Sequence, residues 1–156
     1  MDRAIVRFKD MRALGVDYGA KRIGLALSDA TGMLARPWKT VQRTGNPCQV
    51  AASLAAEVKT LIAEDDGLDV IVLGWPRRLN GEPTDQTSNV AAVADHLRMM
   101  VAVPVTLQDE RLSSLEADAL LAVREKDWRK RKALLDAASA AVILQDYLDS
   151  RAEGRR

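Results

Sequence analysis

The chain has 156 residues, 47% hydrophobic and 29% charged, which is typical of a globular protein and excludes a disordered or fibrous chain. This length predicts a single domain over residues 1–156. The net charge of +1 does not by itself indicate a polyanionic partner, and an aromatic content of 4% argues against a stacking platform for single strands.

The first third of the chain shows the period-two alternation of strands. Residues 11–18 alternate apolar and other side chains, a turn follows at 19–22, and residues 23–28 are predicted to complete a hairpin. A third strand is predicted over 34–42. Pro37 places that strand at a sheet edge, because proline cannot donate a hydrogen bond to its neighbour. Three successive strands predict an antiparallel meander.

Helices and strands alternate in the rest of the chain. Asn46 followed by Pro47 is typical of a helix start, and the helix is expected to end near Gly67. Its core-facing residues are predicted to be Val50, Leu54, Val58, Leu61 and Ile62. The later predicted elements are a strand over 69–74, a helix after Thr84, a strand over 103–107, and helices over 113–125 and 133–148.

This order of elements favours an α/β fold. We predict a mixed five-stranded sheet, in which a three-stranded antiparallel meander is joined to two parallel strands, with helices on its faces. The strand over 69–74 is nearly all apolar and is expected inside the sheet, covered on both faces.

Acidic residues occur at three places where predicted elements begin or end. Asp17 ends an apolar strand, where a carboxylate needs compensation, although it also suits a hairpin corner. Asp109 and Glu110 follow a strand expected to end at Leu107, where open α/β sheets bind ligands, although charged loops are common. Asp136 precedes a run of small residues that would let its helix lie close to the sheet, although an acid in the first turn of a helix explains this residue better when it is considered alone.

Considered together, these acids predict a site for Mg²⁺ or Mn²⁺. Carboxylate oxygens are the natural ligands of both ions, and two ions about 4 Å apart can activate water and stabilise a leaving oxygen. The only histidine, His96, is expected at the surface or boundary of a helix. No Ser-His-Asp, Cys-His, Walker or zinc pattern competes with this interpretation.

A basic stretch precedes Asp136, the third of these acidic sites. Residues 124–132 hold six basic and two acidic side chains, which suits a phosphate backbone, although a solvated linker between helices explains them equally well. Trp128 either packs on the fold or stacks on a base. Lys21 and Arg22 form a second, weaker basic pair in the turn after Asp17.

The sequence also bears on the compartment. The single cysteine, Cys48, excludes an internal disulfide and a multi-cysteine zinc site, and we expect it to pack within a helix. Residues 1–10 have no apolar segment of a signal peptide, and no apolar run is long enough to span a bilayer. We therefore expect a cytoplasmic protein with no membrane contact.

Four segments in this order resemble those of the YqgF/RuvX family: LGVDYGAKRIGLALSD, VIVLGWPRRLNGEP, VPVTLQDERLSS and LLDAASAAVILQDYLD. The family comprises Holliday-junction-resolvase-like proteins and nucleases that process the 5′ end of precursor 16S ribosomal RNA. The similarity covers a core of about residues 12–149. It implies a ribonuclease H-like fold, in agreement with the order of elements read above.

The resemblance also implies roles for single residues. Asp17, Glu110 and Asp136 would be the metal-binding catalytic residues, and Asp109 would be either the ligand in place of Glu110 or its neighbour. The residues expected to contact nucleic acid are Lys21, Arg22, Arg111, Trp128, Arg129, Lys130, Arg131 and Lys132.

The first functional hypothesis is therefore metal-dependent hydrolysis of structured RNA, most directly the 5′ end of precursor 16S rRNA. One alternative is a Holliday-junction resolvase acting on branched DNA, which would normally need a two-fold dimer. Another is a non-catalytic RNA-binding factor of ribosome assembly. The sequence leaves open the substrate, the cleavage position, the preferred metal, and whether the protein is a monomer or a homodimer.

Overall fold

The structure is a computed structural model that describes residues 11–19, 21–75, 85–109 and 128–153. The described strands form one five-stranded sheet in the order β3-β2-β1-β4-β5. The elements are β1 (Ala13–Tyr18), β2 (Arg22–Ser28), β3 (Ala35–Gln42), α1 (Pro47–Ala63), β4 (Val70–Trp75), α2 (Asp85–Met100), β5 (Val105–Asp109) and α4 (Trp128–Glu153).

The sheet has the mixed topology that the sequence predicts. β2 pairs antiparallel with both β1 and β3, whereas β4 pairs parallel with both β1 and β5. β3 is an edge strand, and its register with β2 shifts between Leu25 and Ala26, opposite Pro37. The prediction of a meander joined to two parallel strands is therefore confirmed, as is the edge position of the proline-containing strand.

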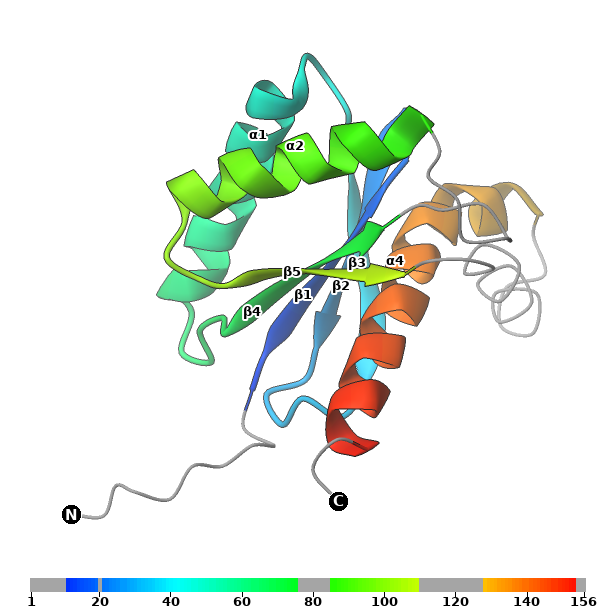
Figure 1. Cartoon of the computed structure of the whole chain (residues 1–156). Coiled ribbons are helices and arrows are strands. Elements are labelled where there is room, and N and C mark those ends of the chain that lie inside the picture. The colour runs from blue at the N-terminus through cyan, green and yellow to red at the C-terminus, as the bar shows by residue number, and fades with distance from the viewer. Residues whose placement is uncertain (1–10, 20, 76–84, 110–127, 154–156) are drawn as a thin grey trace.

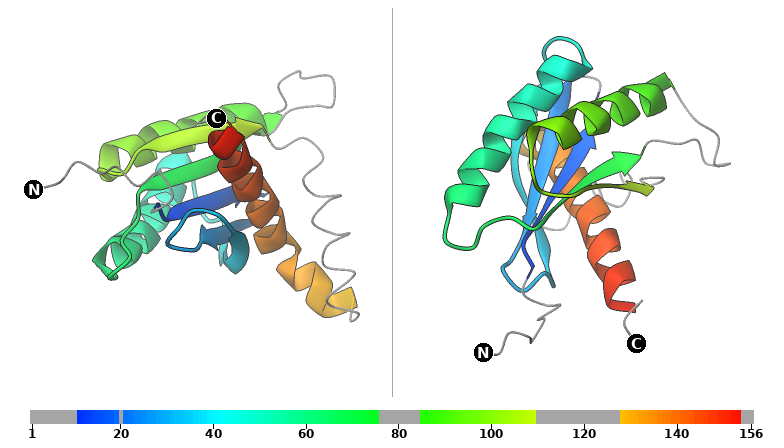
Figure 2. Two further views of the ribbon diagram at one scale, coloured as in Figure 1. Left: turned by 90° about the horizontal axis from the view of Figure 1, so that it is seen from below. Right: turned by 60° about the vertical axis from the view of Figure 1, so that its left-hand side comes forward.

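The helices cover both faces of the sheet. Helices α1 and α2 lie together on one face, and α4 crosses the other face (Figures 1 and 2). Because successive residues of a strand point to opposite faces, β1, β2 and β4 each contribute to two apolar clusters. Leu14, Val16 and Leu73 pack toward α1 and α2, whereas Ala13 and Val72 pack toward α4.

Helix α4 approaches the sheet unusually closely, because two glycines lie beneath it. A Cβ atom on Gly15 would lie 2.8 Å from Leu144 Cβ and 2.9 Å from the carbonyl oxygen of Ala140. A Cβ atom on Gly24 would lie 1.9 Å from the carbonyl oxygen of Asp136. Small helix residues in this segment, including buried Ala137, complete the contact. The backbone of α4 therefore rests directly on β1 and β2.

Helix α1 begins as predicted and ends earlier than predicted. The Asn46 side chain accepts a hydrogen bond from the Gln49 N–H at 2.9 Å, and the Gln49 side chain accepts one from the Asn46 N–H at 2.8 Å. The helix ends at Ala63 rather than near Gly67. The acidic residues at 64–66 disfavour the negative carboxyl end of a helix, and Glu64 has an extended backbone (φ −75°, ψ 157°), which ends the helical path.

Other expectations also need correction. In α1, Ile62 is 45% exposed and Cys48 is exposed, so neither packs in the core. Strand β5 begins at Val105 rather than at residue 103, because Pro104 has no N–H to donate to a ladder. The helix expected at 133–148 spans Trp128–Glu153, since the basic residues that precede it are good helix formers. The predicted helix at 113–125 and the cap at residue 84 lie outside the described residues.

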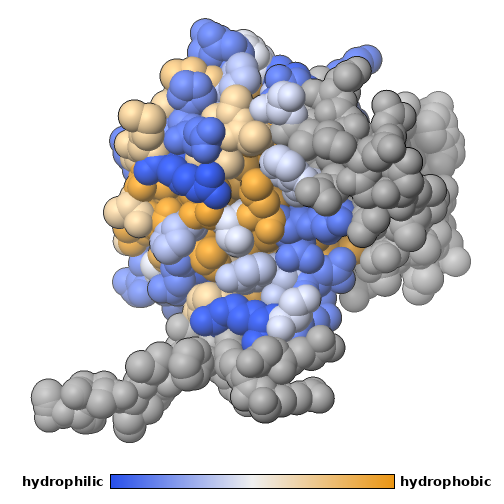
Figure 3. All heavy atoms as spheres, viewed as in Figure 1, coloured by the Kyte–Doolittle hydropathy of each residue, from blue (hydrophilic) through white to orange (hydrophobic). Residues whose placement is uncertain are grey.

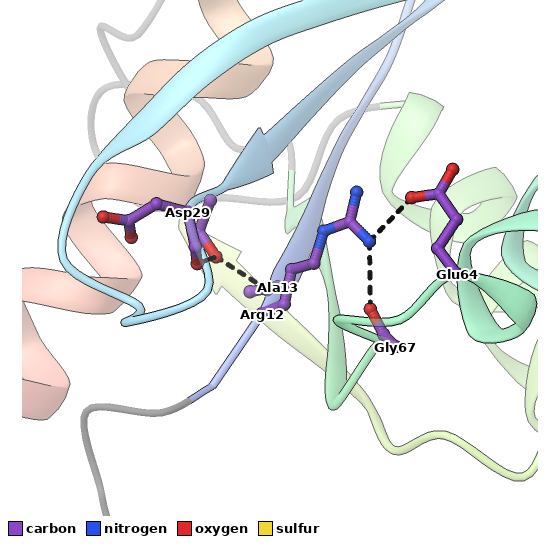
Figure 4. A network of polar contacts seen from close by, with 6 residues as sticks. Arg12, Ala13, Asp29, Glu64 and Gly67 are labelled. Carbon is purple, nitrogen blue, oxygen red and sulfur yellow. Dashed lines mark hydrogen bonds and ion pairs between the residues drawn. The ribbon is translucent and has the colours of Figure 1, made fainter.

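A polar network fixes the amino-terminal end of β1 (Figure 4). The largely buried Arg12 side chain donates to the carbonyl oxygen of Gly67 at 3.2 Å and forms an ion pair with Glu64 at 2.9 Å. The buried Ser28 hydroxyl accepts a hydrogen bond from the Ala13 N–H at 2.8 Å and donates to a backbone carbonyl. These contacts join the start of β1 to the turn after α1 and to the end of β2.

The surface is mixed in character. In Figure 3, apolar residues gather near the middle of the face shown, with hydrophilic residues among and around them. The large apolar side chains that the described residues expose are Met33, Leu34, Ile62, Met99 and Leu134. Within the described part of the chain, no helix has the length and apolar character needed to cross a membrane.

Substituting Gly24 by alanine tests the close contact of α4 with β2. The new methyl group would meet the Asp136 carbonyl, so the helix must move, and we expect a loss of about 3 kcal/mol in the free energy of unfolding. Gly67→Ala is the matched control, because no atom lies within 4 Å and only its positive φ is strained, at about 1 kcal/mol. Urea unfolding of both variants measures the difference; equal losses would contradict the contact.

Asp29 gives the β2–β3 turn a dependence on pH. Burial alone raises the pKa of Asp29, but hydrogen bonds from the Thr31 hydroxyl and the backbone N–H groups of Met33 and Leu34 lower it below its ordinary value. A lowered pKa stabilises the fold above about pH 4, and the contribution disappears as the pH falls through the folded-state pKa.

Asp29→Asn therefore costs about 0.5 kcal/mol at pH 7, a small value because water competes at this partly exposed turn. The cost should shrink as the pH falls through the folded-state pKa, because the wild-type carboxyl then becomes protonated. Urea unfolding of both proteins at pH 7 and at successively lower pH checks this. A difference that stays constant with pH would show that the charge of Asp29 does not matter.

Candidate active site at the carboxyl end of strand β1

Asp17 lies near the carboxyl end of β1, on the face that α4 covers. Its neighbours in the strand, Val16 and Tyr18, belong to the cluster on the opposite face, and Gly15 lies under α4. Alternation therefore places the half-buried Asp17 side chain toward α4. Its direct partner on β2 is Gly24.

Asp136 lies above that same partner residue. Its carbonyl oxygen is so close to Gly24 that a Cβ there would overlap it, and its carboxylate oxygen Oδ1 lies 3.9 Å from the position of a Cβ on Gly19. The side chain is 26% exposed. Since cross-strand partners have Cβ positions about 5 Å apart, the close packing of α4 on Gly24 brings the Asp136 backbone next to Asp17.

Arg22 provides the positive charge at this place. Its Nε donates to Asp136 Oδ2 at 2.9 Å, and the two side chains are 40% and 26% exposed. Arg22 is the first residue of β2, so this contact joins the β1–β2 turn to α4. The neighbouring Lys21 side chain is exposed. Of the two basic residues predicted in this turn, Arg22 thus contacts one of the predicted acids.

Asp109 lies in a different position from the other two acids. It is the last residue of β5 rather than part of a loop, and its partner on β4 is Trp75. Leu107 and Trp75 pack against the cluster under α1 and α2. Asp109 is two residues after Leu107 and pairs with Trp75, so its side chain is on the same face as theirs. That face is opposite the face of Asp17. The structure therefore does not bring Asp109 together with Asp17 and Asp136.

Several predicted site residues lie beyond what the structure describes. Glu110 and Arg111 are outside the described residues. Trp128, Arg129, Lys130, Arg131 and Lys132 form the first turns of α4, and only their backbone is described. In Figure 1 this end of α4 lies beside the carboxyl end of the β1 strand rather than beside its start. The basic stretch is thus helical at Trp128–Lys132 rather than a linker.

The sequence interpretation missed one basic residue at this end of the sheet. Arg43 Nη1 donates to the Gly19 carbonyl at 3.0 Å, and its guanidinium lies 4.3 Å from the centre of the Tyr18 ring. The Arg43 N–H also donates to the Lys21 carbonyl at 3.1 Å. Its position just after the third strand of a meander is the signal that places it beside the β1–β2 turn.

The described part of the site holds the carboxylates of Asp17 and Asp136, with the guanidinium of Arg22 bound to Asp136 and that of Arg43 beside the β1–β2 turn. Among the described residues no group of three potential metal ligands occurs, and Glu110 lies outside those residues. Asp17 and Asp136 come from segments far apart in the chain and meet on one face at one end of the sheet. Their oxygen atoms are the ligands that Mg²⁺ and Mn²⁺ prefer, so the described residues fit a divalent ion.

Residues 11–150 match the family described as "RuvX: Holliday junction resolvase". The chain belongs to this family. The family resemblance seen in the four sequence segments is thereby confirmed, over a range slightly wider than residues 12–149.

Curated relatives of this RuvX-family chain carry the name "Putative pre-16S rRNA nuclease". One from Moorella thermoacetica is 40% identical over 139 residues, covering 89% of this chain and 95% of its own length. One from Geobacillus thermodenitrificans is 36% identical over 141 residues, covering 90% and 99%. One from a Nocardioides species is 41% identical over 141 residues, covering 88% and 86%.

Solved structures support the fold. Thermus thermophilus RuvC, solved with a Holliday junction substrate, matches with a TM-score of 0.52 at 16% identity, covering 91% of this chain and 96% of its own. The nuclease domain of human cytomegalovirus terminase matches with a TM-score of 0.52 at 12% identity, covering 94% and 86%. At these identities the likeness concerns the fold alone. It confirms the ribonuclease H-like fold of this RuvX-family member.

Proposed function

We propose that this RuvX-family chain is a nuclease, dependent on Mg²⁺ or Mn²⁺, that processes the 5′ end of precursor 16S rRNA in the cytoplasm. The observation that carries the proposal is that Asp136, in the first half of α4, packs on Gly24, the cross-strand partner of Asp17. The names of the curated relatives support the RNA substrate. The single free cysteine suits a reducing compartment.

Two of the three proposed metal ligands belong to rigid elements. Asp17 is fixed by the ladders of β1 with β2 and β4, and Asp136 by the packing of α4 on Gly24. We propose Glu110 rather than Asp109 as the third ligand. Asp109 is on the face of β5 opposite Asp17, whereas the family resemblance implies Glu110 as the metal-binding residue.

In this proposal the carboxylates of Asp17, Glu110 and Asp136 hold the ions at the end of the sheet. A bound divalent ion would supply an activated water and stabilise the leaving oxygen. The basic side chains near the site then orient the phosphate so that the scissile bond faces the carboxylates. His96 is half-buried on α2 and takes no part, since that helix covers the opposite face.

Basic groups around the carboxylates provide the contact to the nucleic-acid backbone. Lys21 and Arg43 lie near the β1–β2 turn, and the basic residues at 129–132 begin α4. Phosphate contacts of this kind set the position of a substrate without reading its sequence. We assign Arg111 and Trp128 the same role from the sequence alone.

The same chemistry would also cleave branched DNA. The family description favours that candidate, because it specifies a Holliday junction resolvase. A symmetric four-way junction requires two active sites related by a two-fold axis, whereas trimming one RNA end requires a single site. The proposed RNA function is therefore compatible with a monomer, and the DNA function requires a homodimer.

Charge-removing variants test the catalytic assignment. Asp17→Asn and Asp136→Asn should lower cleavage of a precursor 16S rRNA fragment at least 100-fold in Mg²⁺, because each removes a ligand without changing side-chain size. Glu110→Gln should have the same effect. Asp109→Asn is the matched control one residue away and should keep activity within about threefold. Gel assays with Mg²⁺, with Mn²⁺ and with chelator measure the rates.

Full activity in Asp17→Asn would defeat the catalytic assignment. Loss of activity in Asp109→Asn, with Glu110→Gln unaffected, would reverse the choice between these neighbours. No cleavage of RNA or of a four-way DNA junction by any variant, together with RNA binding, would favour the assembly-factor alternative.

Metal binding should also stabilise the fold. At a Mg²⁺ concentration ten times the dissociation constant, the gain is about 1.4 kcal/mol, which raises the Tm by roughly 4 °C for a chain of this size. Asp136→Asn should abolish this shift. Thermal unfolding with and without Mg²⁺ measures it, and an equal shift in both proteins would place the ion elsewhere.

A further inference from the structure

One contact in the site opposes the proposed use of Asp136. The Arg22 guanidinium donates from Nε to Asp136 Oδ2 at 2.9 Å, so half of this carboxylate is already occupied by a cation from the chain itself. The other oxygen, Oδ1, is the one nearest to the Gly19 position at the end of β1. A divalent ion and Arg22 would therefore share one carboxylate.

The two cations cannot both bind at full strength. A guanidinium hydrogen-bonded to Oδ2 stands about 5 Å from an ion held by the same carboxylate, and at that distance the repulsion weakens binding of a dication roughly tenfold even in water. If the ion needs both oxygens, Arg22 must leave altogether. In either case Arg22 lowers the affinity of the site for metal.

Arg22 also has an alternative partner within reach. Its side chain is 40% exposed, so it is open to solvent on one side while it contacts Asp136 on the other. A guanidinium binds phosphate oxygens in the same charge-assisted, forked geometry in which it binds carboxylates. A nucleic-acid phosphate arriving at this end of the sheet would compete with Asp136 for Arg22.

We propose that Arg22 is a positioning residue that suppresses metal binding at Asp136 until a substrate phosphate draws it away. This proposal rests on the metal site of the proposed function and adds a coupling to it, in which the nucleic acid and the ion each strengthen the binding of the other. Without nucleic acid, Arg22 neutralises Asp136. With nucleic acid, the same charge neutralises the phosphate and leaves Asp136 to the ion.

The test measures metal affinity rather than cleavage. Isothermal titration of the full chain with Mn²⁺ at 0.15 M salt, without nucleic acid, should show Arg22→Ala binding roughly tenfold more tightly than wild type. Lys21→Ala is the matched control, because it removes the same charge from the neighbouring residue. The Lys21 side chain is exposed, so salt screens its charge. Its Mn²⁺ affinity should equal that of wild type.

A second measurement tests the cooperativity. Because coupling is reciprocal, Mg²⁺ should strengthen binding of a 2′-O-methyl RNA hairpin more for wild type than for Arg22→Ala. Fluorescence anisotropy gives the ratio of affinities with and without Mg²⁺ for each protein. The binding of Mg²⁺ by the RNA itself cancels when the two ratios are compared.

The outcomes separate this proposal from the function on which it rests. If Asp136→Asn binds Mn²⁺ as wild type does, the proposed metal site is wrong and the role of Arg22 falls with it. If Asp136→Asn loses Mn²⁺ but Arg22→Ala binds it no more tightly than wild type, only the role of Arg22 is overturned. A purely structural ion pair would give that second result together with a lower Tm for Arg22→Ala.

Discussion

The site depends on the direct contact between the backbone of α4 and two strands of the sheet. Any side chain at Gly24 would separate the helix from β2, and Gly15 has the same role one turn further along α4. Backbone contact of this kind leaves little freedom to slide, so the position of Asp136 is set by packing rather than by its own hydrogen bonds. A polar site thus depends on an apolar and glycine-lined contact.

That contact explains how an unfavourable arrangement of charge is tolerated. Two carboxylates near one another at a partly buried sheet end repel, and the fold offsets this with Arg22 beside Asp136. The strained arrangement is held by the β1 ladders and by the apolar clusters on both faces. A fold that keeps charges at such a place is typical of proteins whose binding or chemistry requires them.

Much of the fold could be predicted from the sequence. The alternation before Gln42 and the apolar run of β4 are strong local signals, and they predict the meander and the inner strand correctly. The errors lie where local patterns are weak. A charged stretch carries no apolar periodicity, so the start of α4 at Trp128 is not visible in the sequence pattern. The start of β5 is shifted by Pro104, which lacks an N–H group, and a hydrophobicity pattern does not register that lack.

The site was predictable in part. The type of residue at Asp17 and Asp136 is visible in the sequence, but their meeting requires the register of β1 with β2 and the placement of α4 above Gly24. The face of Asp109 follows only from strand phase, and the predicted strand ended at Leu107, which left Asp109 in a loop with no defined face. The ion pair of Arg22 joins residues far apart in the chain and has no local signal.

The central claim is that a divalent ion binds between β1 and α4 on the face that α4 covers. A crystal of the protein soaked in Mn²⁺ tests it most directly, because the anomalous scattering of manganese locates the ion. The account predicts a peak within coordination distance of carboxylate oxygens of both Asp17 and Asp136. A peak beside Asp109 on the opposite face would contradict it, as would the absence of a peak near Asp17 at a saturating Mn²⁺ concentration.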